Sequence, residues 1–157
     1  MCFFNKIKTE DVFKMARTKM LAWNTKGIPT LSYRTSTNYS ESKYNYVEKN
    51  KCGFALKTEK DGLRLEFNFS YDKKDKEAWF RIFVYDLDLS YSKEGMRLIK
   101  EKYKQFDFSF MGLTLIVCKK RVCKTVQDCF KYLTDSMAAW NTCDLYSLLV
   151  DLKKLSK

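Results

Sequence analysis

The sequence of residues 52–85, CGFALKTEKDGLRLEFNFSYDKKDKEAWFRIFVY, decides the fold. Every second residue from Leu63 to Tyr71 is apolar, and the residues between them are polar or charged. A period of two is typical of a β-strand with one buried face and one wet face. The Asp-Gly pair at 61–62 favours a tight turn before this strand. The pattern therefore predicts a hairpin, with its first strand over residues 52–58.

A third strand follows the hairpin. The charged run at 72–76 predicts a turn, and residues 79–85 are apolar on both sides of the chain except for Arg81. A strand that is apolar on both sides is typical of the centre of a sheet. We expect the three strands to pair as an antiparallel meander.

Helices are expected before and after this block. The first is predicted over residues 10–24, with Thr9 as its N-cap and with Gly27 and Pro29 beyond its end. A middle helix is predicted over residues 93–104, since apolar residues recur there at helical spacing.

The last third of the chain predicts a second hairpin and two more helices. The hairpin strands are expected over residues 106–110 and 113–119. Thr125 has an acidic residue three positions later, as at a helix N-terminus, and Asn141 repeats that spacing before the final helix. The leucine stripe of the final helix is interpreted as a core face rather than a dimer seam.

These elements predict one α+β domain over residues 1–157. We expect an antiparallel sheet of four to six strands, with the N-terminal helix, the middle helix and the two C-terminal helices packed on it. The pattern between residues 28 and 50 is weaker. Leu31, Tyr33 and Thr35 alternate as in a strand, and the polar stretch 35–42 predicts a loop.

The composition argues against catalysis and against a bound metal or cofactor. The chain has no histidine, so neither a Ser-His nor a Cys-His nucleophile can form. None of the six cysteines forms a Cys-x-x-Cys pair, and no glycine-rich phosphate loop is present. We therefore predict no enzyme, no catalytic residue, no metal site and no cofactor.

The chain also lacks the signals of export and membrane insertion. Its first residues are too short an apolar run for a signal peptide, and no stretch approaches the roughly 18 apolar residues of a membrane span. We therefore expect a cytoplasmic protein in which reduced cysteines pack as small hydrophobic groups.

The charge is the strongest indication of function. With 30 Lys and Arg against 19 Asp and Glu, the formal net charge is +11, which attracts polyanions. The predicted binding residues are basic clusters and loop tyrosines that can stack or make apolar contacts: Lys93, Arg97, Lys100, Lys119, Lys120, Arg121, Lys124, Tyr39, Tyr44 and Tyr46. We expect Lys119, Lys120 and Arg121 to lie between the last strand and the following helix.

The predicted function is a non-enzymatic binding protein whose basic, aromatic-rich surface engages nucleic acid or a nucleic-acid-handling complex. One alternative is an inhibitor or adaptor directed at a host nuclease or defence complex, of the type that mobile elements use, with an acidic protein surface as partner. A second is a magnesium-dependent nuclease, if Glu66, Asp86 and Asp88 converge. A third is that the charge only keeps the protein soluble and that the tyrosines fold back as hydrophobic cover.

Overall fold

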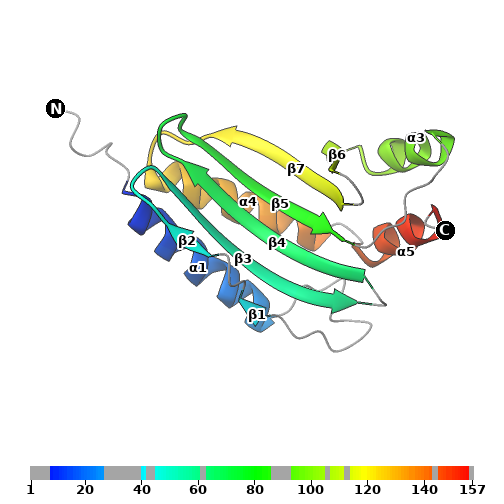
Figure 1. Cartoon of the computed structure of the whole chain (residues 1–157), viewed down its shortest axis with the longest axis horizontal. Coiled ribbons are helices and arrows are strands. Elements are labelled where there is room, and N and C mark those ends of the chain that lie inside the picture. The colour runs from blue at the N-terminus through cyan, green and yellow to red at the C-terminus, as the bar shows by residue number, and fades with distance from the viewer. Residues whose placement is uncertain are drawn as a thin grey trace.

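The computed structural model of the chain describes eight segments: residues 8–26, 40–41, 45–60, 63–85, 93–104, 107–111, 114–142 and 145–155. The predicted α+β class is confirmed (Figure 1). An antiparallel sheet lies in front of two long helices, α1 (Thr9–Lys26) and α4 (Val126–Thr142). Two shorter helices, α3 (Lys93–Lys102) and α5 (Leu145–Leu155), lie toward one end of the sheet.

The sheet follows the predicted meander and hairpin. Its strand order is β1-β3-β4-β5-β7-β6, with β2 also pairing β3. Five strands have five to ten residues each: β3 (Lys51–Lys60), β4 (Leu63–Asp72), β5 (Glu77–Val84), β6 (Asp107–Met111) and β7 (Thr114–Val122). Two further strands have two residues each, β1 (Ser40–Glu41) and β2 (Tyr46–Val47), and lie along the outer edge of β3.

Along β4, apolar and polar residues alternate because successive side chains point to opposite faces of the sheet. Leu65, Phe67 and Phe69 are buried against the helices, and the residues between them are half-buried or exposed on the other face. In the register, Phe69 lies between Phe54 of β3 and Phe80 of β5. Burying one such side chain contributes about 1.5–3 kcal/mol, so this face of the sheet holds the core together.

Helix α1 begins one residue earlier than predicted, and Thr9 has a different role from the one expected. Thr9 is the first helical residue, and its buried hydroxyl donates to the backbone carbonyl of Glu48 rather than capping α1. The carbonyl of Lys8 accepts the first backbone bonds of the helix, from Asp11 and Val12. Thr9 therefore ties the helix to the segment between β2 and β3.

Helix α4 begins with the predicted cap and is bonded to the central strand. The Thr125 hydroxyl accepts from the Asp128 backbone N–H at 3.0 Å, as in a capping box. On the buried face, the Phe80 backbone N–H donates to the Tyr132 hydroxyl at 2.7 Å. The predicted cap at Asn141 is wrong, since α4 continues through this residue to Thr142.

The two shorter helices are joined by a buried and a polar contact. Met96, Ile99, Leu148 and Leu152 are buried, which confirms the core face predicted for the final helix. Asp151 of α5 accepts from the ammonium group of Lys102 at 2.9 Å and from the hydroxyl of Tyr103 at 2.8 Å. Burial opposes ionisation of Asp151, but these two bonds outweigh it and lower the pKa of the carboxyl below its ordinary value.

The cysteines that the structure describes in full pack as predicted. Cys52, Cys123 and Cys129 form no disulfide bond and have no exposed surface. Burial raises the pKa of Cys52 to about 12, and a hydrogen bond to Cys123, with burial, raises the pKa of Cys129. The thiols of Cys52 and Cys129 therefore stay protonated and unreactive at neutral pH.

Two expectations for the weaker region meet the structure only in part. Leu31, Tyr33 and Thr35 lie outside the described residues. Of the predicted loop at 35–42, Ser40 and Glu41 form β1, where Glu41 pairs with Arg17 of α1 at 2.9 Å. Among the described residues, no helix combines the length and the apolar character that crossing a membrane requires.

Candidate functional site

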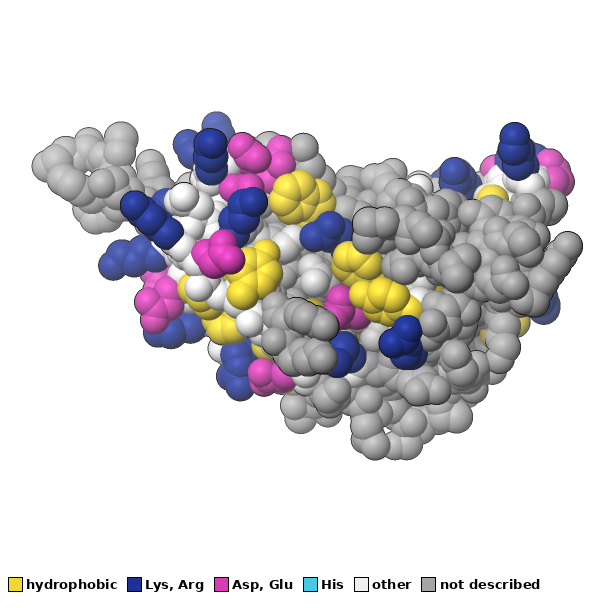
Figure 2. Space-filling view, in the orientation of Figure 1, with side chains coloured by type: hydrophobic (Ala, Val, Ile, Leu, Met, Phe, Trp, Pro, Cys, Tyr) yellow, Lys and Arg dark blue, Asp and Glu magenta, His cyan; other side chains and the backbone are white. Residues whose placement is uncertain are grey.

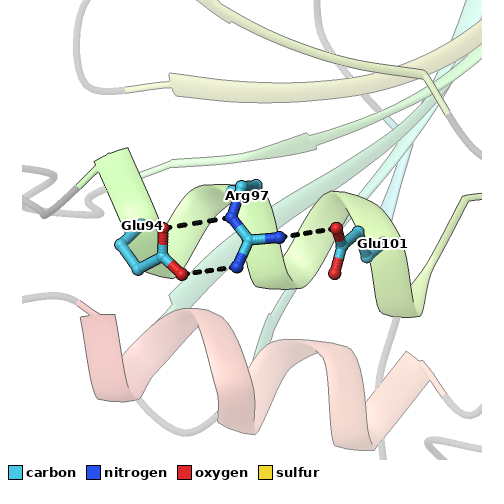
Figure 3. A network of polar contacts seen from close by, with 3 residues as sticks. All are labelled: Glu94, Arg97 and Glu101. Atoms are coloured by element: carbon cyan, nitrogen blue, oxygen red, sulfur yellow. Dashed lines mark hydrogen bonds and ion pairs between the residues drawn. The ribbon is translucent and has the colours of Figure 1, made fainter.

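The three basic residues predicted as a cluster, Lys93, Arg97 and Lys100, do belong to one helix, α3, but the arginine is paired. Arg97 donates through Nε to Glu94 at 3.0 Å and through Nη1 to Glu101 at 2.6 Å (Figure 3). The hydrogen bond to Arg97 lowers the pKa of Glu94. Lys93 and Lys100 are exposed on the same helix. Two carboxylates therefore offset the arginine, and α3 has a mixed charge rather than a basic face.

The second predicted cluster does not lie where the sequence analysis placed it. Lys119, Lys120 and Arg121 belong to β7 and pair with Phe80, Trp79 and Ala78 of β5. The position expected for these three residues, between the last strand and the following helix, is therefore wrong, because the strand continues to Val122. Lys124 does lie between β7 and α4, and it is exposed.

Of the three predicted tyrosines, Tyr39 and Tyr44 lie outside the described residues. Tyr46 belongs to β2 and is 40% exposed.

The structure does not test whether the acidic residues Glu66, Asp86 and Asp88 converge, because Asp86 and Asp88 also lie outside the described residues. Glu66 accepts from the Tyr85 hydroxyl at 3.3 Å, and the described part of the chain holds no group of three acidic or thiol side chains suited to a metal ion.

A different surface brings basic and aromatic side chains together. We call it the open face: the face of the sheet opposite α1 and α4, which none of the described helices crosses in Figure 1. Figure 2 shows this face, with hydrophobic and basic side chains next to one another across its middle and a carboxylate among them. Its residues come from the positions of β3, β4 and β5 that alternate with the core.

The centre of the open face is a row of half-buried residues along β5. We call Trp79, Arg81, Phe83 and Tyr85 the β5 row; each is two positions from the next, so all four share one face. The Arg81 guanidinium lies 5.6 Å from the centre of the Trp79 ring and 5.4 Å from that of Phe83. The Phe83 and Tyr85 rings stack at 6.1 Å. The row therefore holds one positive charge between aromatic rings.

A groove of about 470 Å³ lies beside the β5 row. Its volume is in the range of sites that hold small organic ligands. The lining comes from the segment before β2, from β2 to β5 and from Tyr85: Asn45, Tyr46, Gly53, Phe54, Ala55, Lys57, Arg64, Glu66, Asn68, Ser70, Arg81 and Tyr85. Three of these side chains are cationic and one is a carboxylate, so the groove has a net charge of +2.

Tyr46 forms one end of the groove because Gly53 has no side chain. The two residues pair across β2 and β3, and a Cβ atom at Gly53 would lie 2.6 Å from the Tyr46 Cε1 atom. The neighbouring Asn45 accepts from the backbone N–H of Ala55 at 2.8 Å, which fixes the segment that carries Tyr46. Tyr85 lies at the other end, where the Arg64 guanidinium is 5.5 Å from its ring centre.

Two polar atoms in the groove have no hydrogen-bond partner. Arg81 donates through Nη2 to Ser70 at 2.9 Å, but its Nε is buried and unbonded. The Oδ1 atom of Asn68, directly opposite Arg81 in the β4–β5 pairing, is also buried and unbonded. Buried polar atoms without partners are rare in proteins, so this pair is a candidate for ligand contact.

Most of this surface lies outside the predicted binding residues, since Tyr46 is the one groove residue among them. The sequence does carry one signal for it, because Arg81 is the one charged residue in a run of apolar strand residues. The contribution of Asn68 was not visible, because the register between β4 and β5 cannot be read from either strand alone.

Comparison of the chain with models of known protein families, with curated proteins and with solved structures found no match. The class of protein therefore follows from the fold: an α+β protein whose sheet has one helix-covered face and one open face.

Proposed function

We propose that this protein binds nucleic acid on the open face of its sheet, without catalysing a reaction. The observation that carries the proposal is the β5 row, in which Arg81 lies between the rings of Trp79 and Phe83. Aromatic rings on a sheet surface stack with nucleobases, and arginine contributes both charge and a planar surface for stacking.

The electrostatics support a polyanion as the partner. The whole chain has a net charge of +11, and among the described residues no carboxylate forms an ion pair with Arg81. Arg97, by contrast, already has two carboxylates. Within the described part of the chain, a phosphate can therefore approach Arg81 without displacing an ion pair, and this makes the open face a better candidate than α3.

The test is fluorescence anisotropy with labelled DNA and RNA across a series of salt concentrations, with and without magnesium. We expect the logarithm of the binding constant to fall linearly with the logarithm of the salt concentration. If the anisotropy of the labelled nucleic acid falls when magnesium is present and not when it is absent, the protein cleaves the nucleic acid, and a non-enzymatic role would be contradicted.

Two variants separate the open face from α3 because each removes one positive charge. Arg81→Gln removes a charged contact to the ligand, which costs about 1.5–3 kcal/mol, or roughly tenfold to 150-fold in Kd. Arg97→Gln should change Kd by less than threefold, which corresponds to a change in binding free energy of less than about 0.6 kcal/mol. Equal effects of the two variants would refute the assignment to the open face. No binding to any nucleic acid at low salt would refute the function itself and favour a protein partner, as for an inhibitor or adaptor.

A further inference from the structure

The groove on the open face has the features of a site for an unpaired base. Tyr46 stands at its Ser70 end and Tyr85 at its Arg64 end, so an aromatic ring lies at each end of the β4 segment that lines the groove; Tyr85 already stacks on Phe83, which leaves Tyr46 as the ring for a base. In a duplex the faces of the bases are stacked on one another, whereas the bases of a single strand can turn out and stack on protein rings.

The two unbonded atoms in the groove, Arg81 Nε and Asn68 Oδ1, indicate which chemical groups a ligand should present there. The Arg81 Nε–H is a donor and the Asn68 Oδ1 is an acceptor, and the two residues are direct neighbours across β4 and β5. The edge of every nucleobase carries a donor next to an acceptor, so a base that enters edge-first supplies both missing partners. A phosphodiester has acceptors only and cannot donate to the Asn68 Oδ1 atom.

We propose that the groove binds single-stranded nucleic acid, with one base stacked on Tyr46 and its edge bonded to Asn68 and Arg81. This inference rests on the proposed function and specifies its ligand. Both unbonded atoms are buried, so a lining side chain must move as the base enters. Tyr46 fits that role, because it is 40% exposed and belongs to a strand of two residues. Lys57, exposed at the margin of the groove, contacts a phosphate.

The test compares oligonucleotides of one length: single-stranded homopolymers of each base, an abasic strand with the same phosphates, and a duplex. We expect the strands with bases to bind about 5- to 150-fold more tightly than the abasic strand, which is the range for stacking of one base. The duplex should bind more weakly than the best homopolymer.

Two variants on the same surface distinguish base contact from phosphate contact. Asn68→Ala should reduce the differences in Kd between the homopolymers and leave the salt dependence unchanged. Lys57→Gln should weaken all homopolymers equally and lower the salt slope by about 0.7, the value for one phosphate contact on a single strand. Circular dichroism of both variants verifies that the fold is retained.

The outcomes separate this inference from the function beneath it. If the abasic strand or the duplex binds as tightly as the homopolymers, or if Asn68→Ala leaves the base preference unchanged, the base site is refuted. In that case salt-dependent binding that Arg81→Gln weakens would still support the proposed function. If no nucleic acid binds, both are refuted.

Discussion

Substitution of Gly53 by alanine should displace Tyr46 while the fold stays intact. The added Cβ would lie 2.6 Å from Cε1 and 3.1 Å from Cζ of Tyr46, which is too close for any pair of carbon atoms to remain. The ring is the part that can move, since Tyr46 is 40% exposed and belongs to a two-residue strand.

The stability terms of this substitution nearly cancel. Alanine in place of glycine inside a strand gains about 0.5–1 kcal/mol from the smaller conformational entropy of the unfolded chain. Losing the cross-strand contact between Tyr46 and residue 53 costs about 0.2–1 kcal/mol. The free energy of unfolding, measured by urea denaturation, should therefore change by less than about 1 kcal/mol.

Binding should change much more than stability. If Tyr46 stacks on a base, moving it removes about 1–3 kcal/mol of stacking, or roughly 5- to 150-fold in Kd for single-stranded nucleic acid. Tyr46→Ala should weaken binding to a similar extent. In the double variant the losses should not add, because both substitutions remove the same contact.

A double-mutant cycle measured by fluorescence anisotropy decides the question. Losses that add in the double variant would mean that Gly53 acts through something other than Tyr46. Binding of Gly53→Ala at the level of the unsubstituted protein would refute the reasoning, since the ring would then be displaced without consequence.

Two further predictions concern the strand that carries the site. Tyr132→Phe removes the hydroxyl that accepts from the Phe80 backbone N–H at 2.7 Å. The free energy of unfolding should therefore fall by about 0.5–1.5 kcal/mol in urea denaturation, the net value of one hydrogen bond, and an unchanged value would contradict the contact. Burial, then the charge of Glu66 and its hydrogen bond, raise the pKa of Tyr85 from 10.0 to about 12. The neutral phenol therefore stabilises the fold fully below pH 10.0, and this contribution is lost as the pH rises through about 12. In NMR titrations of isotope-labelled tyrosine, Glu66→Gln should lower this pKa but leave it above 10.0, because burial is the largest cause; a pKa near 10.0 in the unsubstituted protein would contradict the geometry.

The fold could be predicted because its central strands carry their own pattern. From Leu63 to Tyr71 the buried and wet positions alternate without a break, and the charged turn after Asp72 is where the structure has it: the Asp72 Oδ1 atom accepts from the Lys74 N–H at 2.9 Å. Where a strand ends in charged residues, the pattern is misleading. Lys119, Lys120 and Arg121 look like a basic loop, but pairing with β5 continues to Val122.

The site could not be predicted in the same way, because it depends on contacts between strands. Tyr46 lies over Gly53, and Arg81 lies opposite Asn68, only through pairings that no single strand encodes. The pairing of Arg97 with Glu94 and Glu101 could have been predicted, since charges three and four residues apart meet on a helix.

The two faces of β5 give the strongest argument that the open face has a function. Both faces share one backbone, so strand propensity does not distinguish them. The core face is explained by burial, since Ala78, Phe80, Ile82 and Val84 are all at most 2% exposed. A face toward water needs only small polar or β-branched residues such as threonine. The β5 row instead carries large rings that are only half-buried, around an arginine whose Nε has no hydrogen-bond partner. Aromatic rings also stabilise a strand by their partial burial, but an unbonded buried Nε only costs free energy, and it fits a surface that completes its contacts when a stacked, negatively charged ligand binds.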